Sequence, residues 1–177
     1  MSVTLIATDG SPQANAYCDV AYADNFLTTQ RPFVGTEWTG LTTDQKATLL
    51  IWATTYLDDM VDWNGYKATR DQALRWPRSG VYDPDGFYVD KSTVPDRIRQ
   101  WTAETAWEYS KVNRQAEPTA LGQGITDVTV GPIRVKIDPN MQLPYFPPYL
   151  ATKISRYGIL IAEGGPGAFT MARLLRV

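Results

Sequence analysis

Residues 42–60, TTDQKATLLIWATTYLDDM, carry the strongest structural signal in the chain. Thr42 followed three positions later by Gln45 forms a capping box, the pattern with which many α-helices begin. Apolar side chains then recur at spacings of three and four residues, which predicts one buried helix face. That face consists of Leu49, Trp52, Ala53, Tyr56, Leu57 and Met60. Asn64-Gly65, which follows this stretch, predicts the end of the helix.

Three more helices are predicted around this one. Asp19 can cap a short helix that ends before Arg31-Pro32, because the residue before a proline avoids the helical region. Thr93 caps a second strong helix, and residues 149–162 have the spacing of a last one. The apolar stripe of the second strong helix is Ile98, Trp101, Thr105, Tyr109 and Val112.

Trp107 lies on the opposite, polar side of that helix. Two interpretations are open for it: it contacts a partner protein, or another element of the same chain covers it. Residues 67–90 are rich in turn-forming residues and predict an ordered loop, with Asp83–Gly86 as a turn. We expect aromatic side chains to pin this loop in place: Trp76, Tyr82, Phe87 and Tyr88.

Residues 128–137 alternate between apolar and polar side chains, which predicts a hairpin or a kinked strand near residues 125–138. Val3–Ile6 predicts a further short strand. We therefore expect a mainly α fold: a small bundle of about four helices with a β-hairpin and an extended C-terminal arm. The expected domains are residues 1–163 and, beyond a glycine hinge, an arm of residues 164–177.

The arm is apolar enough to bind another protein surface. If extended, it could add a strand to a neighbour, and it could equally fold back on its own domain. With Trp107, its side chains make up the predicted partner interface: Phe169, Met171, Leu174, Leu175 and Val177.

The composition offers little for catalysis. The chain has no histidine and one cysteine, Cys18, so Ser-His-Asp and Cys-His sites and intramolecular disulfides are excluded. Cys18 is expected to be a small, buried or half-buried side chain. The densest acidic cluster is Asp58, Asp59 and Asp62, which we interpret as a solvated helix end rather than a metal site. We therefore expect no enzyme, no catalytic residue, no metal and no cofactor.

Charge and hydropathy limit the possible partners. A net charge of −2 argues against an autonomous binder of duplex DNA. Apolar runs are too short to cross a bilayer, and we expect no signal peptide and no membrane partner. The 6 Trp and 10 Tyr suit either a protein interface or a well-packed core. With the aromatics, the scattered basic residues could form a single-strand surface or simply be solvated: Arg97, Arg99, Arg134, Lys136, Arg173 and Arg176.

Several motifs resemble, in order, those of a family of small tailed-phage proteins often labelled DnaT-like single-stranded-DNA-binding proteins. Ala14–Cys18 is similar to the family's "ANSY" segment and Ala53–Asp58 to its "AT-YLD" helix. The most specific likeness is Trp63-Asn64-Gly65 followed by Gln72–Val81. Val130–Ile133 and Leu174–Val177 keep the same order.

Such proteins are encoded beside capsid and tail genes, and they resemble head–tail adaptors. This resemblance implies a structural connector subunit in the neck of the virion, made in the host cytoplasm. It further implies a homo-oligomeric, dodecameric ring that binds the portal protein on one side and a downstream tail or stopper protein on the other. Genomic DNA would pass through the ring. The alternative function is a single-stranded DNA-binding module.

Overall fold

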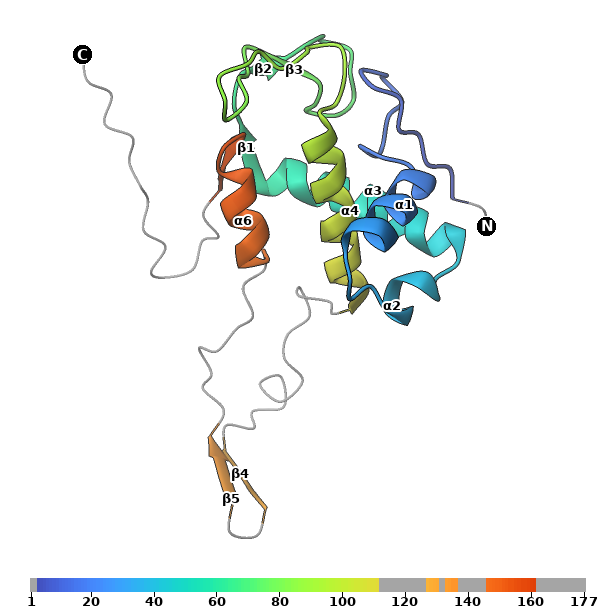
Figure 1. Ribbon diagram of the computed structural model, residues 1–177, viewed down its shortest axis with the longest axis vertical. Coiled ribbons are helices and arrows are strands. Elements are labelled where there is room, and N and C mark those ends of the chain that lie inside the picture. Colours follow the sequence, from blue (N-terminus) through green and yellow to red (C-terminus); the bar gives the residue numbers. More distant parts are fainter. Residues whose placement is uncertain (1–2, 112–126, 131–132, 137–145, 162–177) are drawn as a thin grey trace, which may run out of the picture.

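The computed structural model describes residues 3–111, 127–130, 133–136 and 146–161 (Figure 1). This part is mainly α-helical, as the sequence predicts. Its helices are α1 (Val20–Gln30), α2 (Thr36–Thr39), α3 (Thr43–Met60), α4 (Asp96–Lys111) and α6 (Pro148–Ile154). The division into residues 1–163 and an arm of residues 164–177 stays a prediction, because the proposed arm lies outside the described residues.

Two of the predicted helix starts are confirmed by their capping bonds, whereas the helix predicted from a cap at Thr93 begins only at Asp96. The Asp19 carboxylate accepts a hydrogen bond of 2.7 Å from the Tyr22 amide at the start of α1. At α3, both bonds of the capping box between Thr42 and Gln45 are present. These bonds satisfy amides that the helix itself leaves without acceptors, which is why the local sequence predicts the starts well.

Short antiparallel strand pairs complete the described fold. Strand β1 (Val61–Trp63) pairs with β6 (Gly158–Leu160), and β2 (Tyr66–Lys67) pairs with β3 (Arg78–Ser79). Strand β4 (Asp127–Val130) pairs with β5 (Ile133–Lys136), with Val130 opposite Ile133. Of the two predicted alternatives, a hairpin or a kinked strand, the hairpin is therefore confirmed.

Two further predictions of secondary structure are wrong. The last helix ends at Ile154 rather than Ala162, because residues 158–160 pair with β1 and cannot remain helical. Val3–Ile6 is not a strand, because its backbone groups are bonded by a side chain. The Ile6 amide donates to Asn15 Oδ1 at 2.7 Å, and the Asn15 side chain donates to the Thr4 carbonyl.

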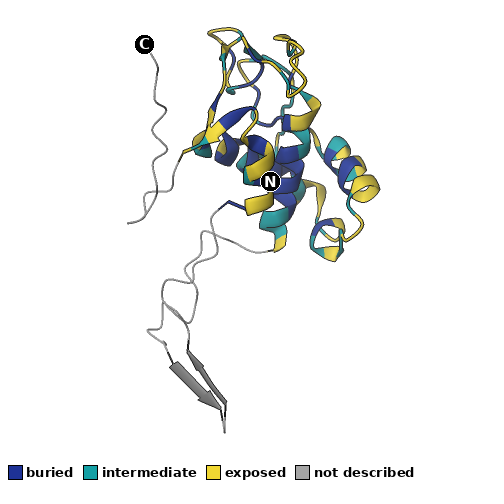
Figure 2. Ribbon diagram, turned by 60° about the vertical axis from the view of Figure 1, so that its left-hand side comes forward, coloured by how far each residue is buried: buried dark blue, intermediate teal, exposed yellow. Residues whose placement is uncertain are grey.

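The core lies where α3 and α4 cross (Figure 1). The C-terminal half of α3 and the N-terminal half of α4 pack with α6 and β1, and the remaining halves pack with α1 and α2. Trp52 contacts both groups of buried side chains. Figure 2 shows the buried residues gathered where the helices meet, with exposed residues along the loops at the top. Cys18 is 1% exposed, as expected.

The Asp58 carboxylate connects the sequence motifs to one another. Its Oδ1 accepts from the Tyr17 hydroxyl at 2.5 Å and from Trp63 Nε1 at 3.1 Å, and its Oδ2 accepts from the Arg75 amide at 3.1 Å. The Tyr17 hydroxyl in turn accepts from the Trp76 amide. The prediction of a solvated helix end is therefore wrong for Asp58, which is 9% exposed, whereas Asp59 and Asp62 are exposed.

Burial raises the pKa of the Asp58 carboxyl, although the donors around it act in the opposite direction. An acid whose pKa is higher in the folded chain contributes stability that is fully present below its unfolded pKa. That contribution is lost as the pH rises through the folded pKa. We therefore expect the free energy of unfolding of the wild type, minus that of Asp58→Asn, to increase as the pH falls from neutral. Urea unfolding of both proteins over a pH series measures this difference, and a constant difference would contradict the assignment.

Arg78 holds the loop between β1 and β3. Its guanidinium donates to the backbone carbonyls of Trp63, Asn64, Gly65 and Arg75 over 2.6–3.2 Å. Gly65 is required beside it, because its φ is +73° and a Cβ there would lie 2.3 Å from the Ser79 carbonyl oxygen. The loop that follows α3 is thus fixed from both sides, by Asp58 and by Arg78.

Candidate nucleic-acid interface

A tight β-hairpin formed by residues 81–89 projects from this fixed loop. The Val89 amide donates to the Val81 carbonyl at 3.0 Å, and the Asp83 amide donates to the Phe87 carbonyl at 2.9 Å. Asp83 Oδ1 accepts from the amides of Asp85 and Phe87, which closes the turn. The predicted turn at Asp83–Gly86 is confirmed, and Gly86 takes the positive φ that it requires.

Three aromatic rings of this hairpin face solvent: Tyr82 is 61% exposed, Phe87 72% and Tyr88 52%. The rings of Tyr82 and Tyr88 pack edge to face with centroids 5.7 Å apart. Of the four aromatic residues expected to pin the loop, Trp76 does so at 1% exposure against Trp63 and Tyr157, and the Tyr88 hydroxyl accepts from the Gly80 amide at 3.4 Å. The expectation is wrong for Tyr82 and Phe87, because the tip of the hairpin is held by its backbone bonds.

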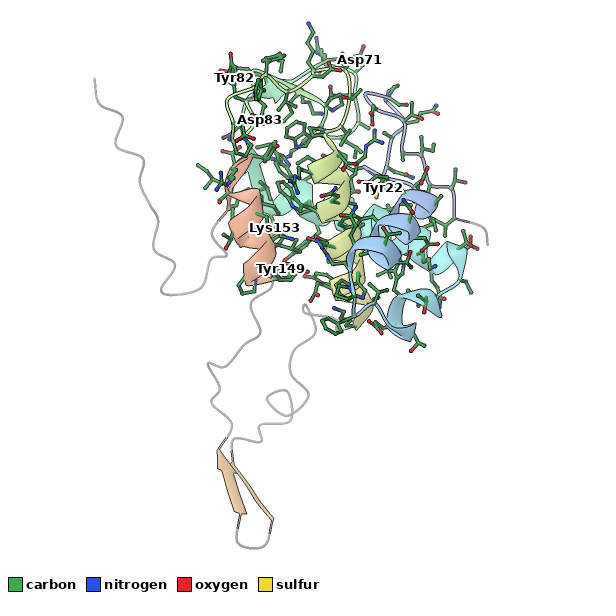
Figure 3. All side chains as sticks on the ribbon, in the orientation of Figure 1. Tyr22, Asp71, Tyr82, Asp83, Tyr149 and Lys153 are labelled. Atoms are coloured by element: carbon green, nitrogen blue, oxygen red, sulfur yellow. The ribbon has the colours of Figure 1, made fainter. Side chains whose placement is uncertain are left out.

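A pocket with a volume of about 560 Å³ lies beside the hairpin. Asp83, Pro84 and Asp85 line it from the hairpin. The rest of its lining comes from α4 and from the region of α6: Arg97, Trp101, Lys153, Arg156 and Tyr157. Figure 3 shows Tyr82 and Asp83 above α6, with Lys153 farther along that helix and Tyr149 at its other end. Tyr82 and Asp83 of the hairpin therefore lie on the same side of the molecule as Lys153, and Tyr22 lies on the other.

The charges around the pocket act on one another. Burial raises the pKa of the Tyr157 hydroxyl, the carboxylates of Asp83 and Asp85 raise it further, and Arg97 lowers it. Burial also lowers the pKa of the Lys153 ammonium, together with nearby guanidinium groups that include Arg97. The pocket therefore brings side chains of both charges close to Tyr157 and Lys153.

Glu104 anchors one of the pocket cations from within the core. Its carboxylate is fully buried and forms a salt bridge with Arg31 at the end of α1. The Lys153 ammonium donates to both of its oxygens, at 3.1 and 3.2 Å. Arg97 and Arg156 have no salt bridge to any of the residues that the structure describes. Two of the three pocket cations are thus available to a bound anion, and the third is held in position.

The structure covers Trp107 with another element of the same chain. Its Nε1 donates to Glu37 of α2 at 3.1 Å, the Lys111 ammonium lies 3.1 Å from its ring centroid, and it is 8% exposed. This supports the second of the two interpretations of Trp107. The other residues of the predicted partner interface lie outside the described residues: Phe169, Met171, Leu174, Leu175 and Val177.

Of the basic residues considered for a single-strand surface, Arg97 lines the pocket and Arg99 pairs with Asp9 at 2.7 Å. Arg134 and Lys136 lie in β5, whose side chains are not described, and Arg173 and Arg176 lie outside the described residues. Sequence reasoning missed Lys153 and Arg156. Their spacing of three on α6 and the turn after it was the available signal.

A family model matches residues 3–177 of the chain, and it is described as "Putative DnaT-like ssDNA binding protein". The chain belongs to this family. No curated protein and no solved structure matches the chain.

This membership of the DnaT-like family corrects the predicted function. The chain was expected to be a head–tail adaptor of a phage particle, in a dodecameric ring with portal and tail or stopper proteins as partners. The description of the matching family names single-stranded DNA binding instead. It supports the alternative prediction, a single-stranded DNA-binding module, with DNA as the partner. The adaptor interpretation rested on motif order, and those motifs build the Asp58 network, which defines a fold rather than a partner.

No helix among the described residues is long and apolar enough to span a membrane. In the same part of the chain, no group of three or more acidic or cysteine side chains is arranged to hold a metal ion. A location in the virion, after synthesis in the host cytoplasm, stays a prediction, because none of these findings bears on it.

Proposed function

We propose that the chain binds single-stranded DNA on the surface formed by the hairpin aromatics and the pocket cations. The observation that carries this proposal is that one hairpin bears three exposed rings, Tyr82, Phe87 and Tyr88, and that its turn lines a pocket with three cations. The description of the family supports the same function.

The two halves of the surface match the two parts of a nucleotide. Unpaired bases stack on exposed aromatic rings, and each stacked base contributes about 1–3 kcal/mol. Arg97, Lys153 and Arg156 offer charge to the phosphates that connect those bases. In duplex DNA the base faces are already stacked on one another, so we expect the aromatic half to discriminate against it.

The negative net charge is compatible with this function, because the charge is unevenly distributed. Several acidic side chains are paired within the fold, as Asp9 is with Arg99, Asp24 with Lys46 and Glu108 with Lys111. The pocket carries three cations against two carboxylates. Local charge, rather than net charge, determines the contacts that a short stretch of phosphate backbone makes.

We also propose that binding involves no chemical change of the DNA, so that the chain is not an enzyme. The lack of histidine supports this, because it removes the commonest general base of proteins. The proposal includes the finer architecture expected from the sequence, a small helical bundle with an arm of residues 164–177. The packing of α1, α2 and α3 against α4 supports the bundle.

Binding should weaken with salt in proportion to the number of phosphate contacts. Each contact on a single strand contributes about 0.7 to the slope of log affinity against log salt concentration. We therefore expect the double variant Arg97→Gln/Arg156→Gln to lose about 1.4 from that slope, as well as affinity at low salt. Fluorescence anisotropy with a labelled, mixed-sequence oligonucleotide measures both quantities, and the recovered oligonucleotide should keep its length.

Lys111→Gln is the matched control, because Lys111 ends the helix that begins near Arg97, about 21 Å away at 1.5 Å per residue. It should leave the slope unchanged. The proposal fails if the wild type does not bind at low salt, or if it binds duplex DNA as tightly as single strands.

A further inference from the structure

The pocket contains more than a phosphate site needs. A site for phosphate alone would be served by Arg97, Lys153 and Arg156, and carboxylates beside them would oppose the anion. Yet Asp83 and Asp85 line the same pocket from the hairpin side. Their charge lowers the attraction for phosphate, so the pocket suits a ligand that offers hydrogen-bond donors as well as an anion.

The two carboxylates have different roles in the free chain. Asp83 Oδ1 already accepts from the amides of Asp85 and Phe87, so this side chain builds the hairpin turn. The Asp85 side chain has no hydrogen bond or salt bridge to any residue within the described ranges, and Asp85 is exposed at the rim of the pocket. It is therefore the carboxylate that can meet a ligand without disturbing the fold.

A nucleotide presents matching groups at its two ends. An ionised carboxylate only accepts hydrogen bonds, and the 4-amino group of cytosine only donates them, which makes this a standard base contact. Thymine has a carbonyl oxygen, an acceptor, in the same place. A carboxylate beside that oxygen faces another acceptor and repels it. The distinction between the two pyrimidines depends on this one group.

We propose that the pocket takes one nucleotide of the bound strand, with its phosphate toward Arg97 and Arg156 and its base edge toward Asp85, and that it prefers cytosine to thymine. This inference rests on the proposed function, since it concerns the same surface. Trp101 and Tyr157, which also line the pocket, offer apolar ring surface to the base between the two ends. Asp85 is thus the residue that determines specificity.

The test compares two labelled oligonucleotides of equal length at pH 7.5, one all thymidine and one with cytidines at its centre. For the wild type we expect about tenfold tighter binding of the cytidine-containing strand, the effect of one good base contact. Asp85→Asn should remove this preference and bind the thymidine strand more tightly than the wild type does. The amide can donate to the thymine oxygen, and a negative charge has been lost.

Asp71→Asn is the matched control. It removes the same charge from an exposed aspartate that Figure 3 places on the top loop, away from Asp83 and Lys153, so the preference should persist in it. Equal binding of both strands by the wild type overturns the inference and leaves the proposed function intact. An Asp85→Asn variant that retains the preference also overturns it. If the wild type binds neither strand, the proposed function itself has failed.

Discussion

Replacing Asp58 with alanine should lower the free energy of unfolding by about 4 kcal/mol, among the largest effects that one substitution produces. The substitution leaves three donors without an acceptor: the buried Tyr17 hydroxyl and Trp63 Nε1, and the partly buried Arg75 amide. Each unsatisfied donor costs about 1–3 kcal/mol. The loss is large even though burial of the carboxylate is itself unfavourable, because breaking such a network leaves its other members behind.

Urea unfolding followed by tryptophan fluorescence measures this loss, since Trp63 and Trp76 belong to the network. Asp59→Ala is the control: its side chain is the exposed neighbour on the same helix, and we expect a change within about 0.5 kcal/mol. Similar losses for both variants would mean that the Asp58 bonds do not hold the loop.

The double variant Tyr82→Ala/Phe87→Ala should bind single-stranded DNA about a hundredfold more weakly than the wild type, since each lost stacking contact costs about 1–3 kcal/mol. Both rings face solvent in the free chain, so few intramolecular contacts are lost. Stability should therefore change little, and thermal unfolding of the variant checks this. Affinity measured by anisotropy at low salt reports the loss.

Phe33→Ala is the control for this experiment. Phe33 is 86% exposed and lies between α1 and α2, far from the hairpin in sequence and outside the pocket lining. Its removal should leave affinity unchanged. If Phe33→Ala weakens binding as much as the hairpin variant does, DNA contacts aromatic side chains without a defined surface, and the assignment of the hairpin is wrong.

Local signals in the sequence predicted the elements that local chemistry determines. The capping box at Thr42 and the cap at Asp19 were both identified, because each bond joins residues only three positions apart. The turn at Asp83–Gly86 was found for the same reason. The end of the last helix was missed, because it depends on pairing between residues 158–160 and β1, almost a hundred positions earlier in the chain.

The candidate interface was only partly predictable. Nothing near Asp58 in the sequence indicates that Tyr17 reaches it, so a structural carboxylate looked like a solvated one. The pocket gathers residues from the hairpin, α4 and the region of α6, and no spacing rule connects these segments. The hairpin aromatics were expected to pin their loop, since composition does not distinguish a ring that packs within the chain from a ring that is exposed to a ligand.

The Asp58 network has a consequence for how the chain folds. Its three donors lie 41, 5 and 17 positions from Asp58, so no single segment completes it alone. Ordering of the loop that carries the hairpin is therefore cooperative with docking of the N-terminal segment on α3. A partly folded chain has no assembled binding surface. On the proposed function, DNA that binds only the folded chain would stabilise it by mass action and so protect it from unfolding.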